Sequence, residues 1–292
     1  MKLTTLAARL APLAPRMRCP QCGGALMLNG AQSLVCANRH TFDLSARGYV
    51  NLAPGHDQQA EKYTAALFDS RARVFADGFY AHVADVLASA VSIRLSAAHR
   101  VPAATPAPLV LDVGCGEGYY ARALAARLPA ATVAGVDLSR DAVLAAARQA
   151  PSLHWFVADL TRLPFLTGAV AALVDVLTPA DYREFGRVLA PHGLLYKLIP
   201  ADDYLTEIRQ AVAGRLQGEP FSNARVISHL ADNADVLERV AVRRTLPVTP
   251  AQAQDFLRMT PMTFGLEAET LAGITFPQIT VAMELFVCRL RR

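Results

Sequence analysis

Three of the five cysteines lie close together near the start of the chain, and a histidine follows the third. Cys19 and Cys22 are separated by two residues, and Cys36 and His40 by three, with a loop between the two pairs. Two turns of this kind can place four donors tetrahedrally around Zn²⁺ at ~2.0–2.3 Å, and four protein ligands leave no open position for chemistry. The cluster therefore predicts a structural zinc site.

Disulfide bonding is the alternative use of clustered cysteines. Secreted domains stapled by disulfides are short and rich in cysteine, whereas this chain has 5 cysteines in 292 residues and is 53% hydrophobic. The other two, Cys115 and Cys288, lie far from the cluster, and the total is odd. The composition favours metal binding and a reducing, cytoplasmic compartment.

A second group of residues suited to chemistry begins with the glycine-rich segment LDVGCGEGYY at 111–120. It follows an apolar run and precedes a helical one, so it predicts a strand-to-helix turn whose backbone can approach a ligand closely. Position 119 is Tyr119, where the G-x-G-x-x-G pattern of dinucleotide-binding folds needs a glycine. The segment thus argues against a nicotinamide cofactor.

Three aspartates stand at the ends of successive β-like runs, namely Asp112, Asp137 and Asp159. A carboxylate at the tip of the second strand can accept hydrogen bonds from both hydroxyls of a ribose, which suits Asp137. Asp159 is placed to meet an adenine amino group. Each acid alone could instead cap a helix, but the recurrence at successive strand ends favours a nucleoside site.

The elements that must position these residues are also visible in the pattern. From about residue 108, short β-like runs alternate with helical stretches, which is typical of βαβ units and a parallel sheet. The last runs, 236–248 and 279–290, are expected to close the sheet as an antiparallel edge. Apolar residues at helical spacing predict a broken helical element over 58–96, interrupted near Gly78.

The segments LDVGCGEGYY, GVDLS and VADLTRLPF together resemble the class I S-adenosylmethionine-dependent methyltransferases over about 108–200. The resemblance implies an α/β, Rossmann-like fold with a mostly parallel seven-stranded sheet. It implies that the turn on the methionine side of the cofactor is formed by Asp112, Gly114, Cys115 and Gly116. It also implies that Asp137 binds the ribose and that Asp159 and Leu160 flank the adenine.

The chain also resembles a narrower family, the large-subunit ribosomal RNA guanine-N1 methyltransferases. The order of the zinc cluster, FDLSARGYVNL at 42–52, RARVFADGFY at 71–80 and the glycine turn carries this resemblance, which covers most of the chain. It implies zinc on Cys19, Cys22, Cys36 and His40, and a cofactor contact from Tyr80. Two departures are Tyr204, at a cofactor contact that is often histidine in the family, and the acidic segment IPADDYL.

The domain organisation follows from these motifs. The predicted parts are an N-terminal extension (1–17), a zinc-binding RNA-recognition module (18–52), a helical linker region (58–100) and the methyltransferase domain (108–292). A signal peptide at the N-terminus is disfavoured, because Arg9 interrupts the apolar stretch. No apolar run approaches the ~20 residues that span a bilayer, so no membrane partner is expected.

The leading hypothesis is methyl transfer from S-adenosylmethionine to N1 of a guanine in a hairpin loop of 23S rRNA. The alternatives are methylation of another RNA or a small molecule, and a zinc-ribbon RNA-binding protein whose methyltransferase domain is inactive. After the fourth strand, DVLTPADY at 175–182 has a single proline and no cysteine, unlike amino-nitrogen and pyrimidine carbon-5 methylases. The catalytic base is not identified; Asp175 and Asp181 are candidates, but a capping or solvated role suits each of them better than catalysis.

The charge balance is compatible with an RNA partner. The net charge is +4, and arginine greatly outnumbers lysine, which occurs only at positions 2, 62 and 197. Arginine can grip phosphate through two hydrogen bonds, although genome composition explains such a bias equally well. In the zinc-binding module, Arg18, Arg39 and Arg47 are candidates for phosphate contacts. A homodimer is an open alternative to a monomer.

Overall fold

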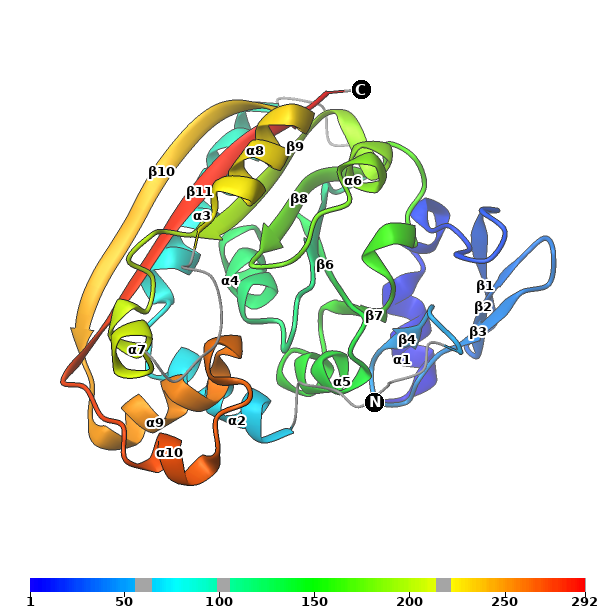
Figure 1. Cartoon of the computed structure of the whole chain (residues 1–292). Coiled ribbons are helices and arrows are strands. Elements are labelled where there is room, and N and C mark those ends of the chain that lie inside the picture. The colour runs from blue at the N-terminus through cyan, green and yellow to red at the C-terminus, as the bar shows by residue number, and fades with distance from the viewer. Residues whose placement is uncertain (56–64, 99–105, 214–221, 292) are drawn as a thin grey trace.

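The computed structural model describes residues 1–55, 65–98, 106–213 and 222–291. In this part of the chain, one large mixed sheet carries helices on both faces, and a smaller three-stranded sheet lies beyond its β4 end (Figure 1). The large sheet has the strand order β10-β11-β9-β8-β5-β6-β7-β4. Its strands are β4 (Val50–Asn51), β5 (Leu109–Val113), β6 (Thr132–Asp137), β7 (His154–Val157), β8 (Val170–Val176), β9 (Leu189–Pro200), β10 (Ala234–Pro247) and β11 (Gln278–Leu290).

Strands β4 to β9 pair with one another in parallel, and β11 is antiparallel to both β9 and β10. Residues 108–292 supply seven strands, as predicted. The last two strands do pair antiparallel, but β11 lies inside the sheet and β10 forms the outer edge. The eighth strand, β4, comes from the end of the zinc-binding module, because Val50 and Asn51 pair with Phe156 and Val157 of β7.

The helices are placed by caps and breaks that the sequence supplies. Ser139 begins one helix, its Oγ accepting a hydrogen bond from the backbone N–H of Ala142 at 3.3 Å. Gly78, with φ +81°, separates two others, as predicted; the predicted ends of that region, 58–64 and 99–100, lie outside the described residues. The helices are α1 (Leu3–Leu10), α2 (Ala65–Ala76), α3 (Ala81–Ala98), α4 (Tyr119–Arg127), α5 (Arg140–Gln149), α6 (Tyr182–Val188), α7 (Thr206–Ala211), α8 (Ala224–Asn233), α9 (Pro250–Met259) and α10 (Ala268–Ala272), with 3-10 turns η1 (Ala14–Arg16), η2 (Leu160–Arg162) and η3 (Pro261–Thr263).

Alternate side chains of the central strands point to two separate cores. Val110 of β5 packs with α3, α4 and α5 on one face, while Leu109 and Leu111 pack with α1, α6 and α8 on the other. This burial on both faces explains why the central strands read as continuous apolar runs. Helices α2, α9 and α10 gather at the end of the molecule toward which the parallel strands point (Figure 1).

The predicted N-terminal extension, 1–17, is a packed part of the molecule. Leu6, Leu10 and Leu13 are at most 2% exposed, and they lie in the same core as β5 and β7. Met17 forms an isolated β-bridge with Phe165. The extension therefore holds the zinc-binding module against the methyltransferase domain.

The small sheet of the zinc-binding module has the order β1-β2-β3 (Leu26–Asn29, Ser33–Cys36 and Thr41–Asp43). Its strands are antiparallel. Among the described residues, no single helix is long and apolar enough to cross a membrane; one bent helix pair, Leu67–Ala76 with Ala81–Ala97, passes by length and composition.

Candidate metal centre and cofactor site

The four predicted metal ligands come together in the zinc-binding module. The Sγ atoms of Cys19, Cys22 and Cys36 and a ring nitrogen of His40 all lie within 4.8 Å of one another. Cys22 Sγ is 3.6 Å from Cys36 Sγ, and Cys36 Sγ is 3.4 Å from His40 Nδ1. Metal–ligand bonds of ~2.0–2.3 Å at tetrahedral angles would separate the donors by about 3.4–3.8 Å, so the cluster fits Zn²⁺.

Each half of the cluster is a turn closed by backbone hydrogen bonds. The N–H of Cys19 donates to the carbonyl of Gly24 at 2.7 Å, and the N–H of Cys36 donates to the carbonyl of His40 at 3.1 Å. Gly23 has φ +76°, and a Cβ there would lie 2.8 Å from Arg18 Nη2. The first turn therefore requires glycine at this position.

The protonation of the thiols also suits a metal. A hydrogen bond from the backbone of Gly24 is the main influence that lowers the pKa of Cys22 to about 6, whereas burial raises the pKa of Cys19. Zinc binds the thiolate. All five cysteines are free of disulfides, so the cluster serves as a set of metal donors.

The glycine turn after β5 fits closely against its surroundings. Gly114 has φ +66°, and a Cβ there would lie 2.2 Å from Thr178 Oγ1 in the loop after β8. Gly118, at the start of α4, has φ +78°, and a Cβ there would lie 2.3 Å from the ring of Trp155. Larger residues would displace the turn, which keeps its backbone open to a ligand. Cys115, within the turn, is buried.

Asp137 lies beside this turn, at the carboxyl end of β6. Its Oδ2 accepts a hydrogen bond from the N–H of Gly116 at 2.9 Å, and its Oδ1 accepts one from the N–H of Ser139 at 2.8 Å. Burial raises the pKa of Asp137, and these two N–H groups oppose that shift. Each carboxylate oxygen can accept a further bond, so the geometry leaves Asp137 able to bind a diol.

Buried polar atoms without a partner surround the same turn. They are Asp112 Oδ2, Glu117 Oε1 and the hydroxyl of Tyr120, in residues that are at most 8% exposed. Burial raises the pKa of Asp112 to about 8 and also raises the pKa of Glu117. Buried acceptors need a donor, and the ammonium group of S-adenosylmethionine is a donor that fits two carboxyl groups.

A residue that the motifs did not single out faces the turn from α2. A Cβ on Gly116 would lie 4.0 Å from Arg71 Nη1. The Arg71 charge lowers the pKa values of Glu117 and Asp137 against the larger effect of burial. Arg71 Nη2 donates to the carbonyl of Met259 at 3.3 Å. The sequence signal was its place in RARVFADGFY, nine residues before Tyr80.

Tyr80 and Tyr204 come from distant parts of the chain and meet. Their hydroxyl groups form a hydrogen bond of 2.6 Å, and the side chains are 1% and 6% exposed. The charge of Arg71 lowers the pKa of Tyr204 against the effect of burial, which raises the pKa of both tyrosines. The two predicted cofactor contacts thus form one buried pair close to the glycine turn.

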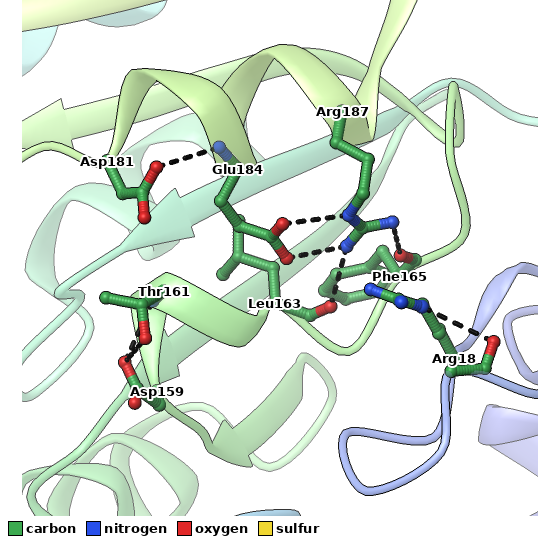
Figure 2. A network of polar contacts seen from close by, with 9 residues as sticks. Arg18, Asp159, Thr161, Leu163, Phe165, Asp181, Glu184 and Arg187 are labelled. Atoms are coloured by element: carbon green, nitrogen blue, oxygen red, sulfur yellow. Dashed lines mark hydrogen bonds and ion pairs between the residues drawn. The ribbon is translucent and has the colours of Figure 1, made fainter.

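Asp159 takes the capping role that was the alternative reading. Its Oδ1 accepts hydrogen bonds at 2.8 Å from both the backbone N–H and the hydroxyl of Thr161 (Figure 2). It is the N-cap of η2, which Leu160 begins. Since these bonds go to Oδ1, Oδ2 is left for an adenine amino group, and Leu160 is half-buried at the same strand end.

The two candidate bases have structural partners. Asp181 accepts a hydrogen bond from the N–H of Glu184 at 2.9 Å and is the N-cap of α6 (Figure 2). Asp175 is fully buried, and its Oδ2 pairs with Lys197 Nζ at 2.6 Å. Burial raises the pKa of Asp175 to about 6, against the opposing charge of Lys197. Asp181 is therefore a helix cap, and Asp175 is half of a buried ion pair.

Comparison with known proteins places both parts of the chain. A family model described as RlmA, N-terminal, matches residues 17–61, and one described as Methyltransferase domain matches residues 110–193. YxjB of Bacillus subtilis (strain 168), assigned as a 23S rRNA (guanine-N(1)-)-methyltransferase, is 32% identical over 92% of this chain and 95% of its own. A protein of Micromonospora griseorubida with the same assignment is 32% identical over 96% and 98% of the two chains. The 23S rRNA (guanine(748)-N(1))-methyltransferase of Streptomyces fradiae is 29% identical over 94% and 96%.

Proposed function

The chain belongs to the 23S rRNA (guanine-N(1)-)-methyltransferase family, and we propose that it methylates N1 of a guanine in a hairpin loop of 23S rRNA. It is an S-adenosylmethionine-dependent enzyme with a structural zinc ion. The observation that carries the proposal is the combination, in one chain, of a four-donor metal cluster and a glycine turn ringed by unpartnered acids.

The proposed cofactor site is built from the carboxyl ends of β5 and β6. Asp137 takes the ribose, Asp159 and Leu160 flank the adenine, and the backbone of the turn at Gly114, Cys115 and Gly116 faces the methionine part. A second set acts on the charged end of the methionine. Asp112 and Glu117 accept hydrogen bonds from its ammonium, and Arg71 pairs with its carboxylate. The Tyr80–Tyr204 pair closes the site from the turn before α3 and the segment after β9.

The zinc-binding module is proposed to hold RNA. Arg39 and Arg47 are exposed there, which leaves them available to phosphate, whereas Arg18 donates to the carbonyl of Gly23 at 3.3 Å. The module is fixed to the methyltransferase domain, since the N–H of Arg18 donates to the carbonyl of Pro164 at 3.0 Å. RNA bound on the module would thus be held at a constant position relative to the cofactor.

The target edge of the base has to be unpaired. Guanine N1 lies on the Watson–Crick edge, which is accessible where loop bases are splayed out of the stack. When bound, S-adenosylmethionine supplies an electrophilic methyl group on a sulfonium. Loss of the N1 proton would free the electron pair that forms the N1–CH₃ bond as the S–CH₃ bond breaks, which gives a neutral methylated base and a neutral thioether. The protein residues would bind and orient the base and stabilise the negative charge that it carries before the transfer.

The test is methyl transfer to defined acceptors. We expect the purified protein to transfer labelled methyl groups to hairpin transcripts of 23S rRNA and to cause primer-extension stops at one guanine, because an N1 methyl group blocks base pairing. Label in a different RNA or a small molecule instead would support the first alternative. Label in no acceptor, despite cofactor binding, would support an inactive zinc-ribbon protein.

Two further parts of the proposal concern the cell and the assembly. A cytoplasmic location stays a prediction, based on free cysteines in a chain that buries its core without disulfides. The second part is that the protein forms a homodimer, and light scattering on the purified protein tests this.

A further inference from the structure

A pocket of about 660 Å³ opens where β8 and β9 end, at the carboxyl edge of the sheet. Its walls come from the loop after β8 and the start of α6, from the last residues of β9, and from α8 with the residue just before it. This volume falls within the ~300–1,000 Å³ of typical small-ligand sites. In an open α/β sheet, ligands bind outside the carboxyl ends of the strands, so the position is that of a substrate site.

This pocket, which we call the β8–β9 pocket, adjoins the glycine turn. Thr178 lines the pocket, and its Oγ1 would lie 2.2 Å from a Cβ on Gly114. The side chain of Thr178 is therefore a common wall between the pocket and the proposed cofactor site. A molecule in the pocket would be next to the turn that faces the methionine part of the cofactor.

The walls are mainly apolar and partly exposed. Leu177 and Val226 line the pocket with 46% and 41% of their surfaces exposed, so apolar surface there is open to a ligand. Leu177 also has φ +56°, a left-handed conformation that costs about 1–3 kcal/mol in a non-glycine residue and clusters at functional sites. Tyr182 and His229 add aromatic rings that meet edge to face at 4.8 Å. Such walls suit a flat base.

Of the two cationic side chains that line the β8–β9 pocket, Arg225 is exposed and Lys197 is buried. Lys197 lines it with only 4% of its side chain exposed. Its Nζ donates to Asp175 Oδ2 at 2.6 Å and to the carbonyl of Thr178 at 3.1 Å. An ammonium group has three donors and no acceptor. These two bonds fix the direction of Nζ and leave one N–H for a ligand.

We propose that the β8–β9 pocket receives the target guanine, flipped out of the RNA, and that Lys197 Nζ donates a hydrogen bond to its O6. The inference rests on the proposed function and names the acceptor site for it. O6 is bonded to C6, the carbon next to N1, and loss of the N1 proton delocalises negative charge onto O6. Lys197 would thus stabilise the form of the base that attacks the methyl group, while the proton passes to solvent.

The same contact gives a reason for selecting guanine over adenine. Adenine carries an amino group at position 6, which presents donors where guanine presents an acceptor. Lys197 offers only donors. With adenine in the pocket, the third N–H of Lys197 would have no acceptor and would face the donors of the adenine amino group. A site built to bond one group rejects the analogue that lacks it.

The first test uses the base itself. Hairpin transcripts carry guanine, or 2-aminopurine, which lacks O6, at the position found by primer extension, and equilibrium binding is measured. We expect the native protein to bind the guanine hairpin about 10-fold or more tightly, as loss of a bond to a charged donor implies. The double variant D175N/K197M, which leaves no buried charge unpaired, should bind both hairpins equally. A preference retained by that variant would overturn the role of Lys197.

The second test closes the pocket and does not depend on removing the ion pair. Val226→Trp fills the mouth, and Val236→Trp, at a residue 45% exposed on β10, is the matched control. We expect V226W to lose at least about 90% of methylation, while calorimetry gives native S-adenosylmethionine affinity, and V236W to behave as native. Equal activity of the two variants would overturn the pocket assignment. A native protein that methylates no guanine would instead refute the proposed function itself.

Discussion

Replacement of Asp137 gives the sharpest test of the cofactor site. In the proposed complex, its carboxylate accepts two hydrogen bonds from the ribose, and bonds to charged groups contribute ~1.5–3 kcal/mol each. Asp137 is only partly shielded from water, and solvent screening weakens such bonds. The expected loss of binding free energy is therefore near the lower end of this range, about 3 kcal/mol for the two bonds together. Asp137→Ala should therefore raise the Kd for S-adenosylmethionine by about 100-fold.

The same substitution also removes the acceptor for Gly116 and Ser139, which tie the glycine turn to β6. Part of the lost affinity would come from a looser turn, and Asp137→Asn separates the two effects because it keeps one acceptor of the same size. Asp141→Ala, at an exposed position four residues on, is the control. Isothermal titration calorimetry measures all four proteins. Native affinity in both Asp137 variants would mean that the ribose lies elsewhere, and the proposed arrangement of the cofactor would be wrong.

Three other perturbations follow from the structure. Cys36→Ser should contain no zinc by elemental analysis and should no longer methylate rRNA. Its Kd for S-adenosylmethionine should stay within a few-fold of native, because the zinc ligands lie outside the large sheet. Lost cofactor binding would show instead that the zinc-binding module supports the cofactor site. Arg187→Ala should lower the free energy of unfolding by about 3–5 kcal/mol, since Arg187 pairs with Glu184 at 2.7 Å and donates to the carbonyls of Leu163 and Phe165 (Figure 2). Urea unfolding measures this loss, and Arg183→Ala, at an exposed position on the same helix, is the control. A loss no larger than that of the control would contradict the prediction. Burial lowers the pKa of His154 to about 4, below the ~6.5 of a histidine in an unfolded chain. Between these two pH values the unfolded state binds more protons than the folded state. The free energy of unfolding should therefore fall as the pH falls, by up to about 3 kcal/mol. His154→Gln should flatten that dependence between pH 7 and pH 4.5, and an unchanged slope would refute the assignment.

The parts of the site that could be predicted are those written in short segments. The zinc cluster and the glycine turn each depend on spacings of a few residues, which fix backbone turns and donor positions almost independently of the rest of the chain. The position of Asp137 beside the glycine turn was predictable for a related reason, since strand ends that follow one another in a parallel sheet meet at one edge.

The parts that could not be predicted depend on packing between distant segments. Tyr80 and Tyr204 are 124 residues apart, and no local pattern pairs their hydroxyl groups. The joining of β4 to the large sheet was hidden because Val50 and Asn51 pair with Phe156 and Val157, about a hundred residues later in the chain. For Lys197 a signal was present, because a lysine within an apolar strand of an arginine-rich chain indicates a buried partner.

Identification of the modified nucleoside tests the central claim most directly. A 23S rRNA hairpin transcript is incubated with the protein and S-adenosylmethionine, digested to nucleosides and analysed by liquid chromatography with mass spectrometry. The account predicts N1-methylguanosine as the methylated product, at up to one per hairpin, and its absence when Asp137→Ala replaces the native protein at low cofactor concentration. A methyl group on another atom of guanine, or on another nucleoside, would contradict it.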